Sequence, residues 1–107
     1  MEMEAKTAGV IPRNAEFFQD HFPEFPVLPG VLALDILKQA VERCLDKNWT
    51  LTAIRNVKFS SYLRPGDTWE SEVKCAPGNE AEKTEWTARL YHEGRPAVMA
   101  KMVFERK

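Results

Sequence analysis

The stretch VLALDILKQAVERCLD, from Val31 to Asp46, decides the fold of this chain. Apolar side chains recur in it at steps of three and four residues, which is the spacing of one face of a helix. The stripe consists of Leu34, Leu37, Val41 and Leu45, widened by Ile36, Ala40 and Cys44. Most of the charged side chains lie off the stripe. We therefore predict one helix from Val31 to about Asp46, with an apolar face broad enough to pack on a sheet or to be wrapped by one.

The rest of the chain favours strands on both sides of this helix. A short strand is expected around Gly9–Ile11, and residues 1–7 are expected to be frayed. Four later segments have strand character and are separated by turn signals: Leu51–Leu63, Thr68–Ala76, Thr84–His92 and Pro96–Arg106. In the second of these, one face would carry Trp69, Ser71, Val73 and Cys75. The order predicts a single α+β domain over residues 1–107, with the helix lying on an antiparallel sheet.

Composition narrows the class of partner. The chain has 107 residues, with 15 basic and 16 acidic side chains and a net charge of −1, which gives no electrostatic footprint for nucleic acid. No apolar segment approaches the roughly 18–20 residues that a membrane span needs, and the start MEMEAKTAG lacks the pattern of a signal peptide. Cys44 and Cys75 lack metal-ligand spacing. We expect a cytoplasmic domain without membrane or nucleic-acid partners, small enough for an oligomer to stabilise it.

A second stretch, HFPEFPVLPG from His21 to Gly30, precedes the predicted helix. Because proline fixes φ and removes a backbone donor, this stretch is expected to be a fixed, irregular loop that holds His21 near the helix start. Gly30 would lie in the first turn, where N–H groups lack partners and the helix dipole is positive. Asp35 follows about a turn and a half later. Gln39 lies one turn beyond on the same face, where its amide can hold the carboxylate.

These residue types point to proton abstraction beside a carbonyl. The histidine would take the proton, the helix-end N–H would stabilise the developing enolate oxygen, and the carboxylic acid would protonate the leaving group. A lone histidine beside prolines is more often structural, and Asp35 also fits the polar edge of an amphipathic helix. An aspartate among apolar neighbours is costly to bury unless it is paired or used. We therefore treat catalysis as a hypothesis at this point.

The stretch FFQDHFPEFPVLPGVLALDILKQ resembles the signature of the 3-hydroxyacyl-[acyl-carrier-protein] dehydratases of fatty acid synthesis. That family carries His-Phe-Pro-x-x-Pro-Val-x-Pro-Gly, then a carboxylate, then a glutamine. His21, Asp35 and Gln39 match these positions and their spacing. VKFSSYLRPGDTW similarly resembles the strand and turn that follow the central helix in the family. The resemblance is strong over Val10–Gly66 and extends to the remaining strands in pattern.

The resemblance implies a hot-dog fold, in which an antiparallel sheet wraps one long central helix, and a homodimer or higher oligomer with sheets joined edge to edge. It implies that His21 removes the α-proton of a 3-hydroxyacyl thioester on acyl carrier protein or coenzyme A. Asp35 would then protonate the departing hydroxyl, with the two groups contributed by different chains. Gly30 would supply the oxyanion N–H and Gln39 would orient Asp35. No metal or cofactor is implied. The acyl tunnel would be lined by Phe22, Pro29 and Val31.

The sequence departs from the family pattern at two positions, where Asp20 and Glu24 replace glycines that the family often has. These carboxylates would repel an acidic carrier protein. Asp35 replaces the glutamate of the commoner subgroup and matches the subgroup that also isomerises the double bond. The motif on so short a chain looks most like the stand-alone dehydratases of polyketide or aryl-polyene synthesis.

Two other functions stay open. A hot-dog acyl thioesterase would use a carboxylate to direct water at the thioester carbonyl, and a non-catalytic subunit would bind an acyl carrier or support a partner enzyme. Basic side chains at Arg55, Lys58 and Arg64 fit a carrier-binding patch or an ordinary solvated face.

Overall fold

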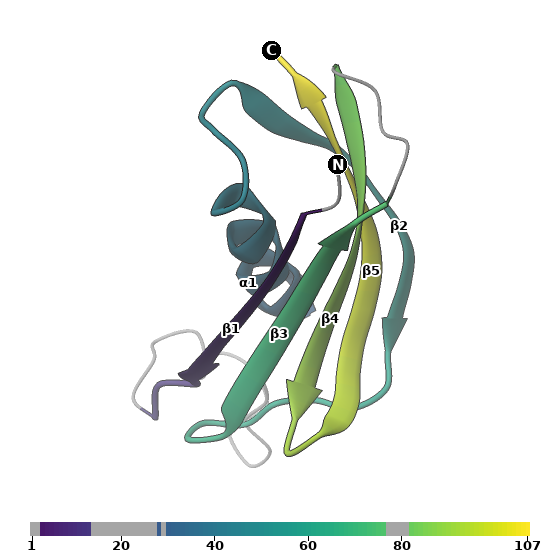
Figure 1. The fold of residues 1–107 in the computed structure, drawn as a ribbon. Helices are drawn as coiled ribbons and strands as arrows, with labels where there is room; N and C mark the ends of the chain where they lie inside the picture. The colour runs from purple at the N-terminus through teal and green to yellow at the C-terminus, as the bar shows by residue number, and fades with distance from the viewer. Residues whose placement is uncertain (1–2, 14–27, 29, 77–81) are drawn as a thin grey trace.

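The computed structural model describes residues 3–13, 28, 30–76 and 82–107. Over these residues the chain forms one helix and five strands. The elements are β1 (Glu4–Val10), α1 (Gly30–Glu42), β2 (Trp49–Phe59), β3 (Thr68–Cys75), β4 (Lys83–His92) and β5 (Arg95–Arg106). The strands make one antiparallel sheet in the order β1-β3-β4-β5-β2, and α1 lies against one face of it (Figure 1). The predicted α+β class, with one helix on an antiparallel sheet, is confirmed.

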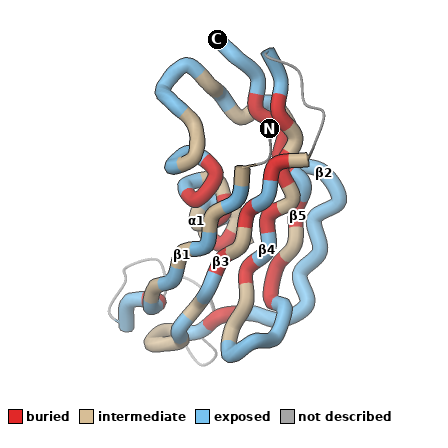
Figure 2. The backbone as a smooth tube through the Cα atoms, viewed as in Figure 1, coloured by how far each residue is buried: buried red, intermediate tan, exposed pale blue. Residues whose placement is uncertain are grey.

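Alternation of apolar and polar side chains explains which face of the sheet meets α1. In β3 the residues Ser71, Val73 and Cys75 are buried, as the pattern predicted. Their neighbours across the ladders in β4 and β5 are buried too, so red segments run through the middle strands in Figure 2. Side chains that sit opposite one another on adjacent strands share a face. The core is therefore a set of rows that cross the sheet beneath α1.

One of these rows has small side chains, and this is where a helix can approach the sheet closely. The strand registers bring together Ala5, Val73, Ala88 and Ala100. The helix contributes small residues of its own, since Ala33 and Ala40 are buried beside Leu37 and Val41. Larger rings fill the flanking rows, with Trp86 and Phe104 fully buried. The small side chains of this row thus let the twisted sheet curve closely around the buried face of α1.

The strand β2 is irregular, and its irregularities decide which side chains face the helix. Its register against β5 shifts between Leu51 and Ala53 and again between Arg55 and Lys58. The first shift brings Ile54 opposite the core residue Met102. An extra residue in one strand reverses the alternation that follows it, so each shift changes the face that later side chains take. Ile54 consequently shares the core face, and Arg55 lies opposite Lys101 on the outer face.

Three expectations for the element boundaries are wrong. The strand predicted over Leu51–Leu63 is β2, which begins at Trp49 and ends at Phe59. Residues 1–7 do not fray as a unit, because β1 begins at Glu4 and pairs along its length with β3. That partner lies far away in sequence, so local composition could not reveal it. The helix ends at Glu42 rather than near Asp46, since Cys44 and Leu45 bond carbonyls three residues back in tighter turns.

His92 connects the β4–β5 hairpin with the turn before β3. Its Nδ1 lies 2.6 Å from the Thr68 carbonyl oxygen, and its Nε2 lies 3.9 Å from carboxylate oxygens of Asp67 and Glu93. The ring is part-buried between two turns. It therefore ties the β4–β5 hairpin to the start of β3.

Candidate active site

The amino end of α1 carries partial positive charge that no side chain of its own first turn neutralises. The helix begins at Gly30, and its first turn, all of whose residues the structure describes, carries no acidic side chain. The first four N–H groups of a helix lack intrahelical acceptors, and the helix dipole adds a partial positive charge there. Without a carboxylate of its own in that turn, α1 leaves this charge available to an oxygen that becomes negative.

Asp35 is held in place by one hydrogen bond. The Gln39 amide nitrogen Nε2 donates to Asp35 Oδ2 at 2.7 Å, one turn along α1. Both side chains are exposed in the single chain. The bond directs the carboxylate because a glutamine amide offers a fixed donor direction. The bond uses Oδ2, so the other carboxylate oxygen, Oδ1, remains available to a ligand.

Apolar hollows flank Asp35 on two sides. One has a volume of about 260 Å³ and lies between α1 and the end of β1, with Ile11, Leu32 and Trp69 among its walls. The other has about 340 Å³ and lies between α1 and β2, where Leu34, Leu51 and Ile54 contribute. Asp35 lines both hollows. The Asp35 carboxylate thus lies on the part of α1 between the two hollows, which we call the apolar ridge. Such a setting suits a group that contacts a largely apolar ligand or a second chain.

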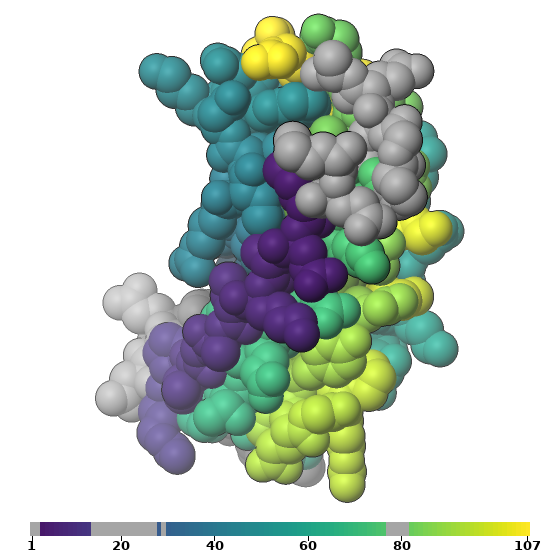
Figure 3. All heavy atoms as spheres, viewed as in Figure 1, coloured from purple at the N-terminus to yellow at the C-terminus, as the bar shows by residue number. Residues whose placement is uncertain are grey.

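Val31, expected in the acyl tunnel, lies on this ridge too. Its side chain is 72% exposed and lines the hollow between α1 and β2. Figure 3 shows one face of the molecule, with β1 running between the helix and β3. So large an exposed apolar side chain beside Asp35 is consistent with a site that is incomplete in one chain.

The remaining predicted site residues, His21, Phe22 and Pro29, lie outside the described residues, as do Asp20 and Glu24. The distance between His21 and Asp35 therefore stays a prediction. What the structure does describe is the chain on either side of this segment. Ile11 exchanges backbone hydrogen bonds with Asp67 and Gly66, and the Leu28 N–H donates to the Leu63 carbonyl at 2.6 Å.

One flank is thus anchored to the turn RPGD at residues 64–67, and the other is anchored to Leu63, the residue just before this turn. The Asp67 carboxylate closes the turn by accepting from the Arg64 N–H at 2.8 Å. Gly66 has a φ of +85°, which favours glycine, and the Arg13 guanidinium packs against it. Sequence reasoning treated RPGD as a simple turn. Its further role is to fix where the His21 segment leaves and rejoins the described fold.

Phe59 is a site residue that sequence reasoning missed. A Cβ built on Gly30 would come within 2.9 and 3.1 Å of two carbons of the Phe59 ring. The ring therefore lies directly against the start of α1. The sequence offered one signal for this contact. Asparagine tolerates the left-handed conformation that a bulge can require, and Asn56 lies three residues before Phe59.

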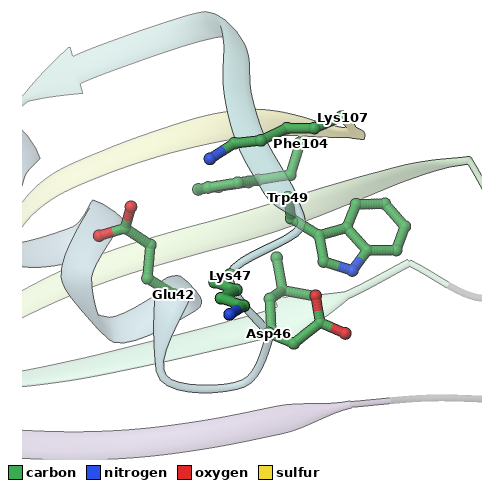
Figure 4. Close-up of a pocket in the computed structure, with 7 residues that line it drawn as sticks. Glu42, Asp46, Lys47, Trp49, Phe104 and Lys107 are labelled. Carbon is green, nitrogen blue, oxygen red and sulfur yellow. The ribbon is translucent and has the colours of Figure 1, made fainter.

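A separate cavity of about 430 Å³ lies at the carboxyl end of α1 (Figure 4). Phe104 and Trp49 form aromatic walls, and Lys47 and Lys107 are among its other side chains. It contains none of the predicted site residues. Arg55, Lys58 and Arg64 are exposed, as either reading of them requires.

Comparison with known structures assigns the fold. The (R)-hydratase of A. caviae involved in PHA biosynthesis superposes with a TM-score of 0.81 at 17% identity, covering 98% of this chain and 95% of that one. The fluoroacetyl-CoA thioesterase FlK gives 0.78 at 16%, covering 96% and 84%. The dehydratase heterocomplex ApeI:P from Xenorhabdus doucetiae gives 0.73 at 26% identity, covering 96% and 88%. The protein has the hot-dog fold.

Sequence comparison assigns the family. The model of the ApeI-like family, described as ApeI dehydratase, matches residues 1–99, and the chain belongs to this family. A 3-hydroxyacyl-[acyl-carrier-protein] dehydratase FabZ of Clostridioides difficile is 35% identical over 83 residues, or 69% of this chain and 58% of the relative. The FabZ of Lactiplantibacillus plantarum is 41% identical over 68 residues, or 57% and 46%. The chain spans about half the length of the curated relatives it matches.

Proposed function

We propose that the protein dehydrates a 3-hydroxyacyl thioester, carried by acyl carrier protein or coenzyme A, to the trans-2-enoyl thioester. His21 would take the α-proton, the C3–O bond would break, and Asp35 would give its proton to the departing hydroxyl, which leaves as water. The Gly30 N–H would hold the thioester oxygen as negative charge develops. This chemistry needs no oxidant, metal or cofactor. We expect it to take place in the cytoplasm, in fatty acid or in polyketide or aryl-polyene synthesis.

The observation that carries the proposal is the Gln39–Asp35 hydrogen bond on an apolar ridge beside the open end of α1. The Gln39 amide orients the carboxyl group through Oδ2 and leaves Oδ1 to transfer the proton to the departing hydroxyl. Membership of a dehydratase family and the FabZ names of the relatives support the same reaction.

The proposed site is formed between two chains. Asp35 and Val31 are exposed in one chain, and β2 is a sheet edge that carries the exposed apolar residues Ile54, Val57 and Phe59. We propose that a second copy, or a related subunit as in the ApeI:P heterocomplex, joins at β2 and brings its histidine to Asp35. Without such a partner, an exposed apolar edge strand would promote non-specific association with other chains.

The direct test is hydration of a crotonyl thioester, the reverse reaction, followed by loss of enoyl absorbance. His21→Ala and Asp35→Asn should each lower kcat by about a hundredfold or more, the contribution typical of acid–base groups. Asp46→Asn, at the other end of the helix, is the matched control and should keep its activity. Full activity of either site variant in a folded oligomer would remove the mechanism.

The same assay separates the alternatives. A thioesterase would release free thiol from an acyl thioester, which a thiol reagent detects, whereas a dehydratase leaves the thioester intact. The thioesterase neighbours share the fold at identities too low to speak for activity. A non-catalytic subunit would give neither product alone and would stimulate a partner enzyme. Mass spectrometry over a panel of 3-hydroxyacyl thioesters would then assign chain length and carrier.

A further inference from the structure

A backbone irregularity aims one aromatic side chain of β2 at the helix start. Between Arg55 and Lys58 the register against β5 shifts, and Asn56 takes a φ of +53°. Strict alternation from the inward-facing Ile54 would turn Lys58 toward α1. The extra residue reverses this, so that Phe59 lies opposite the core residue Val98.

The Phe59 ring occupies the place that a side chain on Gly30 would take. The three nearest ring carbons lie 2.9, 3.1 and 3.6 Å from an ideal Cβ on Gly30; the first distance is too short for a real side chain and the second is tight. In a helix both the Cα–Cβ bond and the N–H point toward the amino end. The ring therefore stands beside the path to the Gly30 N–H.

Little room for water remains on the protein side of this contact. A hollow of about 10 Å³ separates Phe59 from Leu28, Tyr62 and Leu63, about the volume that one water needs. The outer part of the ring is open, with Phe59 41% exposed. An oxygen that reached the Gly30 N–H would thus meet an apolar wall, where a hydrogen bond to developing charge is stronger than in water.

We propose that Phe59 is a positioning residue of the thioester site: its ring fixes the start of α1 and forms the dry wall beside the Gly30 N–H. This inference rests on the proposed function for its chemistry. It also explains why position 30 carries glycine. The Phe59 ring leaves too little room for a side chain there.

A double-mutant cycle on crotonyl thioester hydration tests this inference. Phe59→Ala should lower kcat about tenfold or more with KM changed less than about threefold, because the wall shields charge that develops in the transition state. Gly30→Ala should also lose activity, because its methyl group displaces the ring. Phe59→Ala/Gly30→Ala should be no worse than Phe59→Ala alone, since the clash is gone. Lys101→Ala, a truncation of an exposed side chain on the outer face of the neighbouring strand β5, should stay within about twofold of wild type.

Multiplied losses in the double variant would show that the two residues act independently and would overturn the inference, as would an unchanged kcat in Phe59→Ala. Size-exclusion chromatography and circular dichroism confirm that each variant folds and assembles. If Phe59→Ala does not fold, Phe59→Leu takes its place in the cycle with the same expected pattern. A wild-type protein inactive on both carrier-linked and coenzyme A-linked thioesters would refute the proposed function itself. An active wild type with additive variants would refute the role of Phe59 alone.

Discussion

The two edges of the sheet are built differently. At one edge β1 pairs with β3 without a register shift, and its outer side carries charges such as Lys6, which contacts Glu72. At the other edge β2 has two shifts against β5, and its exposed residues include the apolar Ile54, Val57 and Phe59. Charged side chains protect an edge from association, whereas an apolar edge invites it. From this difference we expect a second chain to join at β2 rather than at β1.

The largest expected effect comes from placing a charge on the apolar edge. Val57→Glu should weaken self-association by about a hundredfold, because two buried carboxylates would then face each other or apolar surface. Sedimentation velocity over a range of concentrations measures it. The matched control is Ala8→Lys on β1, opposite Glu70, which should leave association unchanged. Equal responses at the two edges would contradict the comparison.

A methyl group added at the β1 edge should destabilise the fold itself. A Cβ on Gly9 would lie 2.5 Å from the Trp69 ring, so Gly9→Ala should cost about 1–3 kcal/mol through overpacking. Urea denaturation measures the loss. Gly9→Ala/Trp69→Leu should recover part of it, because the smaller side chain frees the space. A neutral Gly9→Ala would mean that the ring moves aside freely.

The irregular edge depends on backbone conformation more than on packing. Asn56 has a positive φ, so Asn56→Val should cost about 1–2 kcal/mol, whereas Asn56→Gly should be close to neutral. The valine variant should also lose hydratase activity, since the bulge aims Phe59. Stability loss without activity loss would separate the bulge from the site.

The smallest effect is expected at the charges of the β1 edge. Lys6 Nζ lies 3.7 Å from Glu72 Oε2 with both side chains partly exposed, so Lys6→Ala should change stability by no more than about 0.5 kcal/mol. The difference should shrink further in high salt. A change well above 1 kcal/mol would show that this edge relies on its ion pair rather than on its pairing with β3.

The sequence predicted the regular parts of this fold because their signals are local. Alternation in β3 and helical spacing along α1 each lie within one element, so both could be read before any contact was known. Only the end of β1 was predicted, around Gly9–Ile11, since its partner lies far along the chain and its alternation is muted by alanine and glycine. The end of α1 was missed because Cys44 and Leu45 continue the apolar stripe beyond the last helical residue.

In the candidate site too, the contacts within one element could be predicted and the contacts between elements could not. Asp35 and Gln39 sit one turn apart, and helical geometry alone places the amide on the carboxylate. Phe59 reaches Gly30 through a bulge and a change of strand face, which residue spacing in the sequence does not encode. The geometry of His21 stays a prediction that rests on the motif.

The pairing of β1 with β3 has a consequence for synthesis of the chain. Thr7 bonds Ser71 across 64 residues, so β1 emerges from the ribosome long before its partner exists. The β4–β5 hairpin joins near neighbours and can close as soon as both strands exist, whereas β1 has to wait for a partner that is distant in sequence. Until β3 emerges, the pairing edge of β1 is exposed. A chaperone or a second nascent chain would find the growing protein most vulnerable at that moment.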